Sequence, residues 1–467
     1  MMRTIKLHNT LTGRVEELVP ERAPEIRMYV CGLTVYGRGH IGNFRTFLAT
    51  DILRRALRYR GYKVVHVMNL TDVDDRIIQL ASEAGTDIPK LTAEPIRAFE
   101  EDMAALGLEM PEVRPKATEH IPEMVALIQG LIDRGHTYTA DGSVYFRIAS
   151  FPEYGRLARL DTDGIQAGAR VDTDKYDKEN ARDFVLWKFK SDEPTWAQWD
   201  APFGKGRPGW HIECSAMAMK YLGETLDLHA GGIDLIFPHH ENEIAQSQGG
   251  TGKPFARHWL HVQHLFVEGR KMSRSEGNVF TIPELVAKGY RTDAIRYLLS
   301  SAHYRTQLNF TWDGLHQATA TLERIHSFVR RLGEIERDGP ASDAVGSMID
   351  KARGAFDAAL ADDLNTPEAL AAVHQLVNDA NVMMAEGTMV KGDAARVRGL
   401  VDEMNSVFAV LVPAEDRLNA EEQSLFDGCQ EARRTRNFAL ADDLRAKLDA
   451  RGIVLEQTAK GTRWRRK

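Results

Sequence analysis

The stretch 26–70 constrains the fold more than any other part of this 467-residue chain. The run "IRMYVC" (26–31) has the apolar character of a short buried strand, and the glycine-bearing loop "GLTVYGRGHIGN" follows it. Apolar residues then recur at helical spacing from Phe44 to Leu57, and "YKVVHVMNL" (62–70) is a second β-rich run. Strand, glycine loop, helix and strand form a βαβ unit, which predicts a parallel sheet. A ligand of such a unit lies where the strand C-ends meet the helix N-terminus.

The rest of the chain divides into segments of different character. The length predicts roughly three domains. A hairpin predicted at 136–148 ("HTYTADGSVYFRI") interrupts the β–α rhythm, which resumes after about 200 with a helix at 212–222 and a strand near 225–229. The segment 258–267 is another strand candidate, and from 281 onward the pattern is almost entirely helical. We therefore expect an α/β fold with an insertion, followed by a mostly α-helical region.

Charge and composition exclude some classes of function. The formal net charge of −7 argues against a protein that coats nucleic acid nonspecifically, although local basic patches can still bind it. Apolar runs such as "VFAVLV" (407–412) are too short to span a bilayer, and the first twenty residues lack the apolar core of a signal peptide. Three widely separated cysteines, Cys31, Cys214 and Cys429, suit a reducing compartment. We expect a cytoplasmic protein without a membrane partner.

The segment "IFPHHENEIAQSQ" (236–248) carries the densest group of metal-binding side chains. With Pro238 at the first helical position, His239 and Glu243 lie one turn apart on one face. That spacing lets both bind one ion, and Cys31 and Cys214 could supply two thiols. No CxxC pair is present, so the spacing alone leaves a metal site and a solvated helix surface both open.

Two glycine-bearing loops suit phosphate or nucleotide groups. In "GRGHIGN" (37–43) the glycines allow close backbone approach, the helix N-terminus attracts anions, and His40 adds a donor; a tight turn with a structural histidine is the alternative. In "HAGGIDL" (229–235), Gly231 and Gly232 permit close approach, and Asp234 could accept hydrogen bonds from ribose hydroxyls.

A third loop, "EGRKMSRSEGN" (268–278), combines basic residues with hydroxyls. Lys271 and Arg274 in a flexible loop suit a lid over polyphosphate, and a solvated charge run is the alternative.

Together these stretches resemble class I aminoacyl-tRNA synthetases and, within that class, the cysteinyl-tRNA synthetase family. "GHIGN" resembles the His-Ile-Gly-His signature, and "KMSRS" resembles Lys-Met-Ser-Lys-Ser. "MYVCGLTVY", "NLTDVDDRI", "GRPGWHIECSAM", "DLHAGGIDLIFPHHENEIAQS" and "GTRWRRK" resemble segments of the cysteine enzymes, so the resemblance covers essentially the whole chain. Two positions depart from the signatures: Asn43 stands where a second histidine often stands, and Arg274 replaces the second lysine.

The resemblance implies a Rossmann-type parallel-sheet catalytic domain split by an insertion, a mostly α-helical region and a small C-terminal anticodon-binding domain. The expected boundaries are 1–118 for the first half of the catalytic domain, 119–200 for the insertion, 201–268 for the second half, 269–335 for the "KMSRS" loop and stem-contact helices, 336–412 for a helical bundle, and 413–467 for the anticodon-binding domain.

The resemblance also assigns roles to individual residues. It implies zinc on Cys31, Cys214, His239 and Glu243, with His240 and Glu241 outside the ligand set. It implies ATP binding or catalysis by His40, Gly42, Asn43, Gly231, Gly232, Asp234, Lys271 and Arg274. It implies cysteine binding by Gly32, Thr71, Trp210 and His229. The basic, tryptophan-containing tail and the "RRTR" cluster suit RNA, which points to Arg433, Arg436, Trp464, Arg465 and Arg466.

The implied activity is ATP-dependent activation of L-cysteine and its transfer to the terminal adenosine of cysteine tRNA. We expect one Zn²⁺ per chain, Mg²⁺ with the ATP substrate, and a monomer. An apolar pocket cannot strongly reject serine, which differs from cysteine by one atom, whereas zinc prefers a thiolate to a neutral hydroxyl. The alternative is a ligase of the same ancestry that joins cysteine to an amino-sugar; the long helical and basic C-terminal portion argues against it.

Overall fold

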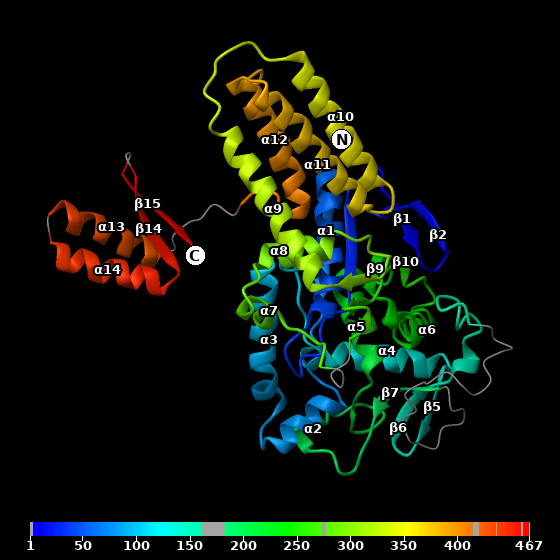
Figure 1. Ribbon diagram of the computed structural model, residues 1–467. Helices are drawn as coiled ribbons and strands as arrows, with labels where there is room; N and C mark the ends of the chain where they lie inside the picture. The colour runs from blue at the N-terminus through cyan, green and yellow to red at the C-terminus, as the bar shows by residue number, and fades with distance from the viewer. Residues whose placement is uncertain are drawn as a thin grey trace. The chain divides into compact units, whose positions relative to one another are not determined.

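The computed structural model describes residues 3–160, 183–272, 277–413, 420–435, 437–458 and 461–466. The chain forms two compact units, Met1–Leu411 and Val412–Lys467 (Figure 1). In the part of the chain described, no helix combines the length and the apolar character that crossing a bilayer requires.

A four-stranded parallel sheet forms the centre of the larger unit. Its strands lie in the order β10-β9-β3-β4, and every neighbouring pair is parallel. Helix α1 connects β3 to β4, so the predicted βαβ unit is confirmed. These elements are β3 (Glu25–Val30), α1 (Ile41–Tyr59), β4 (Lys63–Met68), β9 (Leu226–Gly232) and β10 (Ala256–Val262).

The predicted strand at 258–267 is in fact two strands of different sheets. The chain leaves the parallel sheet after Val262, where the Gln263 N–H donates to the Tyr304 carbonyl. It then enters a three-stranded sheet of order β12-β11-β13. The strands of that sheet are β11 (Leu265–Val267), β12 (Arg270–Lys271) and β13 (Leu308–Phe310).

Helices and a second sheet lie between β4 and β9 in the chain. The predicted hairpin forms at β5 and β6, with Asp141 and Gly142 at positive φ (48° and 76°) in its turn. The antiparallel sheet has the order β5-β6-β7-β8. The elements are α2 (Asp75–Glu83), α3 (Ile88–Ala105), α4 (Ile121–Asp133), β5 (Thr137–Ala140), β6 (Ser143–Phe146), β7 (Phe184–Lys188), β8 (Arg207–Pro208) and α5 (Trp210–Leu222).

Beyond the sheets the larger unit is helical, as the sequence predicts from 281 onward, and a β-hairpin lies near the N-terminus (Figure 1). The helices are α7 (Ile282–Ala287), α8 (Thr292–Ser300), α9 (Trp312–Leu332), α10 (Asp343–Ala361), α11 (Thr366–Ala385) and α12 (Lys391–Phe408). The hairpin strands are β1 (Lys6–Asn9) and β2 (Arg14–Glu17).

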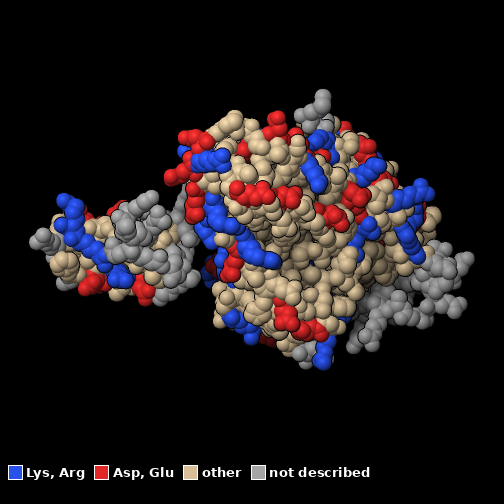
Figure 2. All heavy atoms as spheres, turned by 45° about the horizontal axis from the view of Figure 1, so that its top comes forward, with Lys and Arg blue, Asp and Glu red and all other residues tan. Residues whose placement is uncertain are grey.

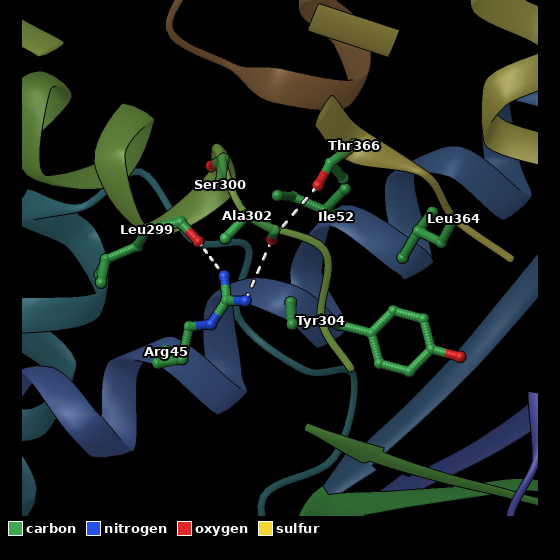
Figure 3. A pocket seen from close by; sticks show the side chains of 9 residues that line it. Arg45, Ile52, Leu299, Ser300, Ala302, Tyr304, Leu364 and Thr366 are labelled. Carbon is green, nitrogen blue, oxygen red and sulfur yellow. Dashed lines mark hydrogen bonds between the residues drawn. The ribbon is translucent and has the colours of Figure 1, made fainter. Parts of the chain in front are cut away.

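Helix α1 is tied to the helical region by buried arginines. Arg45 on α1 donates to the carbonyl oxygens of Leu299 and Ala302, and the Thr366 hydroxyl donates to the same Ala302 oxygen (Figure 3). Arg296 on α8 binds the Asp51 carboxylate of α1 at 2.6 Å and the Phe408 carbonyl at the end of α12 at 2.7 Å. These bonds fix α1, and with it the loop at its N-terminus, against α8, α11 and α12.

The smaller unit has a core of its own. It comprises α13 (Ala420–Arg434), α14 (Phe438–Ala450) and the antiparallel hairpin of β14 (Ile453–Thr458) with β15 (Gly461–Arg466). Cys429, Leu448 and Ile453 are among its buried residues.

Acidic and basic side chains are intermingled on the face of the larger unit drawn in Figure 2. This mixture fits the modest net charge of −7.

Candidate active site

Four side chains from three separate segments meet at the C-terminal end of the parallel sheet. Cys31 follows β3, Cys214 lies in α5, His239 lies in the turn that leads into α6 (Glu241–Thr251), and Glu243 lies in the first turn of α6. All four are buried, and their donor atoms lie within 4.8 Å of one another. The two thiols, an imidazole and a carboxylate form a donor set that could hold a metal ion.

The distances within this cluster are short. Cys31 Sγ lies 3.7 Å from Cys214 Sγ and 3.6 Å from Glu243 Oε1, and His239 Nε2 lies 3.0 Å from Glu243 Oε1. Phe237 has extended backbone angles (φ −139°, ψ 131°) and is the one non-helical residue within Ile236–His240, so the helical backbone starts at Pro238 as predicted and continues into α6 from Glu241. His239 belongs to a single turn that leads into α6, which brings it onto Glu243.

The charges in this cluster stabilise one another. Burial acts to raise the pKa of Glu243, but the nearby His229 and His239 lower it to about 2. Burial acts to lower the pKa of His239, but Glu243 and Cys214 raise it to about 10. Burial and the adjacent Cys214 thiol raise the pKa of Cys31. Burial acts to raise the pKa of Cys214, but hydrogen bonding from Cys31 together with His239 lowers it to about 6. These contacts favour the ionised forms of Glu243 and Cys214, which are the forms that bind a metal ion.

His240 and Glu241 are not surface residues, so the solvated-helix interpretation is wrong. His240 Nε2 lies 3.4 Å from Cys31 Sγ, and Cys31, His229, His240 and Glu243 form a second group that could hold an ion. Glu241 points to the insertion, where its carboxylate accepts from the backbone N–H groups of Gly155 and Ala158 at 2.7 and 2.9 Å.

The sequence did not predict the side chains that contact the Nδ1 atoms of His239 and His240. His211 Nδ1 lies 2.9 Å from His239 Nδ1, and His261 Nε2 lies 2.7 Å from His240 Nδ1. Thr10 in turn holds His261 at 2.7 Å. Such partners fix the ring orientation and tautomer of a metal-binding histidine. The histidines in "GWHIECSAM" and "HWLHVQHLFV" were the available signal.

The "GRGHIGN" loop caps α1 through His40 and Asn43. His40 Nδ1 accepts from the Asn43 backbone N–H at 3.3 Å, and the Asn43 side-chain oxygen accepts from the His40 N–H at 3.0 Å. This reciprocal pair explains an asparagine here, because it satisfies donors at the helix start. A Cβ on Gly42 would lie 2.3 Å from Met272 Cε of the "KMSRS" loop, so the two loops are in contact.

The "GGID" turn lies against the same helix. A Cβ on Gly232 would lie 2.4 Å from Asp234 Oδ1 and 3.8 Å from Thr46 Oγ1 on α1, and Asp234 is exposed. Lys271 lies at the exposed end of β12, and Arg274 lies outside the described residues. The structure thus brings the "GRGHIGN" and "GGID" segments together at the N-terminal part of α1.

The four residues expected to bind cysteine lie in different surroundings. Trp210 is 42% exposed, with its ring centroid 4.4 Å from that of His239. His229 is buried: its Nε2 bonds Glu243 Oε2 at 2.9 Å, and its ring stacks on Trp259 at 4.6 Å. Its contacts therefore orient Glu243. At the ends of β3 and β4, Gly32 contacts Asn69, and Thr71 pairs with Leu33 and Thr34.

The residues expected to bind tRNA fall in the smaller unit. Arg433 is partly exposed at the end of α13, and Arg436 lies outside the described residues. Arg465 and Arg466 belong to β15, and only their backbone is described. Trp464 packs partly buried against the core of this unit.

Comparisons with known proteins agree with this architecture. Residues 17–320 match the family described as "tRNA synthetases class I (C) catalytic domain", and 355–412 match the DALR domain. The chain is 50% identical to the cysteine–tRNA ligase of Solibacter usitatus over 99% of this chain and 100% of that protein. It is 46% identical to that of Koribacter versatilis, over 99% and 100% respectively.

Solved structures show the same fold at low identity. Mycobacterium tuberculosis methionyl-tRNA synthetase in complex with methionyl-adenylate superposes with a TM-score of 0.61 at 16% identity, covering 83% of this chain and 90% of that one. The fold and the matched catalytic domain define a class I tRNA synthetase. Within that class, the chain belongs to the cysteine–tRNA ligase family.

Proposed function

We propose that this enzyme activates L-cysteine with ATP to cysteinyl-adenylate and transfers the cysteinyl group to the 3′-terminal adenosine of cysteine tRNA. The single observation that carries the proposal is the convergence of Cys31, Cys214, His239 and Glu243 at the C-terminal end of the parallel sheet in a chain of this family. In the first step a cysteine carboxylate oxygen bonds to the α-phosphorus and pyrophosphate leaves. In the second step a ribose hydroxyl attacks the cysteinyl carbonyl and AMP leaves.

The four-residue cluster suits zinc. Its two sulfur donors, one imidazole and one carboxylate match the ligands that zinc prefers. Two of these ligands have a hydrogen-bond partner that orients them: His211 contacts His239, and His229 contacts Glu243. When bound there, zinc supplies a preference for a thiolate over a hydroxyl, which is the chemistry that separates cysteine from serine. In the proposal Trp210, whose ring lies beside that of His239, covers the substrate side chain.

The chain's own residues supply positioning and charge for the phosphates. The N-terminus of α1 offers backbone N–H groups that attract anions, and His40 stands at that terminus with Gly42 and Asn43. Gly232 lies against Thr46 of α1 and beside Asp234, whereas Gly231 lies against His240. In the proposal this turn binds the ribose with its base. Lys271 and Arg274, from the loop whose Met272 touches Gly42, would add cationic contacts to the phosphates, with Mg²⁺.

The helical region and the smaller unit favour tRNA over a small-molecule acceptor. An amino-sugar acceptor would need neither the DALR domain nor a second unit with its own core. In the proposal Arg433, Arg436, Arg465 and Arg466 contact the anticodon side through charge. Trp464 contributes only the part of its ring that the core leaves exposed.

Aminoacylation of total tRNA with each labelled amino acid in turn tests the function. We expect cysteine to be the amino acid that becomes acid-precipitable with the RNA, with serine as the matched control. Charging with another amino acid, or labelled cysteine appearing on an amino-sugar instead, would contradict the proposal.

A further inference from the structure

Asn69 lies between the two backbone segments that border the expected cysteine pocket. It follows β4 and is buried, with 1% of its surface exposed. Its side-chain oxygen accepts from the Gly32 N–H at 2.9 Å, and its side-chain nitrogen donates to Thr71 Oγ1 at 3.1 Å. One amide therefore holds Gly32 and Thr71, which come from the ends of β3 and β4.

The backbone around Asn69 leaves little freedom for another arrangement. The Thr71 N–H donates to the Leu33 carbonyl at 3.1 Å, and the Val35 N–H donates to the Thr71 carbonyl at 3.0 Å. A Cβ on Gly32 would lie 1.8 Å from the Asn69 carbonyl oxygen, so the two segments touch where the glycine has no side chain. Gly32 is needed for this contact, and its N–H is already occupied by Asn69.

The direction of these hydrogen bonds matters for the substrate. Because the Thr71 oxygen accepts from Asn69, the Thr71 hydroxyl proton must be donated in another direction. The Thr71 hydroxyl also interacts with the buried carboxylate of Glu213, so Asn69 and Glu213 together fix its orientation.

We propose that Asn69 is a positioning residue for cysteine activation, which acts by orienting Thr71 and the Gly32 backbone toward the backbone groups of the amino acid. The inference rests on the proposed function. The Asn69 amide bonds Gly32 and Thr71 and none of the four proposed metal ligands. In the proposal Asn69 therefore acts on the amino and carboxylate groups of cysteine, which all amino acids share, and not on its thiol.

Three substitutions distinguish the contribution of the Asn69–Gly32 hydrogen bond from that of the Asn69–Thr71 hydrogen bond. Asn69→Leu removes both. Asn69→Asp keeps the acceptor for the Gly32 N–H and the shape, but it cannot donate to Thr71. Thr71→Val removes the hydroxyl itself. Asn405→Leu is the matched control, because the Asn405 oxygen accepts from the Leu411 N–H at 2.8 Å in the helical region.

The readout is cysteine-dependent ATP–pyrophosphate exchange, with KM determined separately for cysteine and ATP. We expect Asn69→Leu to raise KM for cysteine or lower kcat about tenfold, the effect of one lost buried hydrogen bond, with KM for ATP within about twofold of the wild type. Asn69→Asp should show a smaller effect on the same parameter. In the Thr71→Val background, Asn69→Leu should cost less than it costs in the wild type.

The outcomes distinguish the inference from the proposed function. If the wild-type enzyme shows no cysteine-dependent exchange, the proposed function fails. If the wild type is active and Asn69→Asp leaves the cysteine parameters unchanged, the inference is wrong, and this holds even when Asn69→Leu does not fold. The inference is also overturned if Asn69→Leu affects the kinetic parameters for cysteine and for ATP equally, which is the pattern that Asn405→Leu would show if it only loosened the fold. It is overturned as well if the effects of Asn69→Leu and Thr71→Val are fully additive.

Discussion

Cys31 Sγ lies 3.7 Å from Cys214 Sγ, although 183 positions separate the two residues in the chain. Cys31 is placed by the end of a central strand and Cys214 by the first half of α5, whereas His239 and Glu243 come from one short segment. Half of the cluster is therefore local in sequence, and the other half depends on the packing of α5 against the parallel sheet. Metal content consequently reports on the assembled catalytic unit.

Cys214→Ser should abolish tight metal binding. A serine hydroxyl does not ionise near neutral pH and is a poor zinc ligand, so we expect metal content to fall from about one zinc per chain to near zero. Atomic absorption of the purified protein measures this directly. Cys429→Ser is the matched control, because Cys429 is also buried but donates to the Ala441 carbonyl in the smaller unit. Full metal content in Cys214→Ser would remove Cys214 from the ligand set.

His40 has two separable tasks, since its side chain caps α1 and is also proposed to contact the ATP phosphates. His40→Ala should lose both, at a cost of about 1 kcal/mol in stability and about 10²-fold or more in kcat for ATP–pyrophosphate exchange. His40→Asn should keep the cap, because asparagine is a favoured N-cap residue, yet lose the exchange activity. Thermal unfolding and exchange kinetics on both variants provide the measurement. Wild-type exchange by His40→Asn would show that His40 serves only the helix.

The fold was predictable where the signal is local. The strand, loop and helix before β4 were confirmed because periodicity and glycine placement reflect the nearest residues. The pairing of His239 with Glu243 followed from helical spacing, and the extended Phe237 before a helical Pro238 agrees with a proline at the first helical position.

The supporting histidines were not predictable, because their contacts depend on tertiary packing. His211 meets His239 across 28 positions, and His261 meets His240 across 21. No periodicity links such positions; only the parallel alignment of β9 with β10 and the packing of α5 bring the rings together. The same reason hid the burial of His240, which a helix-surface pattern would expose.

His66 makes the larger unit sensitive to acid. It is buried in β4, neither ring nitrogen has a hydrogen-bond partner among the described residues, and burial, reinforced by Arg54 and Arg58, lowers its pKa to about 3. An unfolded histidine has a pKa near 6.5, so between about pH 6.5 and 3 the unfolded chain binds a proton that the folded protein does not. The contribution of His66 to the free energy of unfolding is therefore fully present above this window and is lost as the pH falls through it.

His66→Leu should remove this acid sensitivity. Relative to the variant, the wild type should lose about 1.4 kcal/mol of unfolding free energy for each pH unit inside the window, and the two should respond alike above pH 7. Urea unfolding followed by circular dichroism at pH 7, 6 and 5 measures the difference. Parallel stability curves for the two proteins across this range would contradict the assignment.

Deletion of residues 413–467 should separate cysteine activation from tRNA charging. The deleted segment forms a compact unit with its own buried core, so its loss should leave the larger unit folded. Cysteine-dependent ATP–pyrophosphate exchange should stay within about twofold of the full chain, because none of the groups proposed for activation is removed. Charging of cysteine tRNA should fall about tenfold or more through a higher KM for tRNA, since basic contacts to RNA are lost. Exchange activity is the internal control for folding, and equal charging by both proteins would reject a tRNA-binding role for this unit.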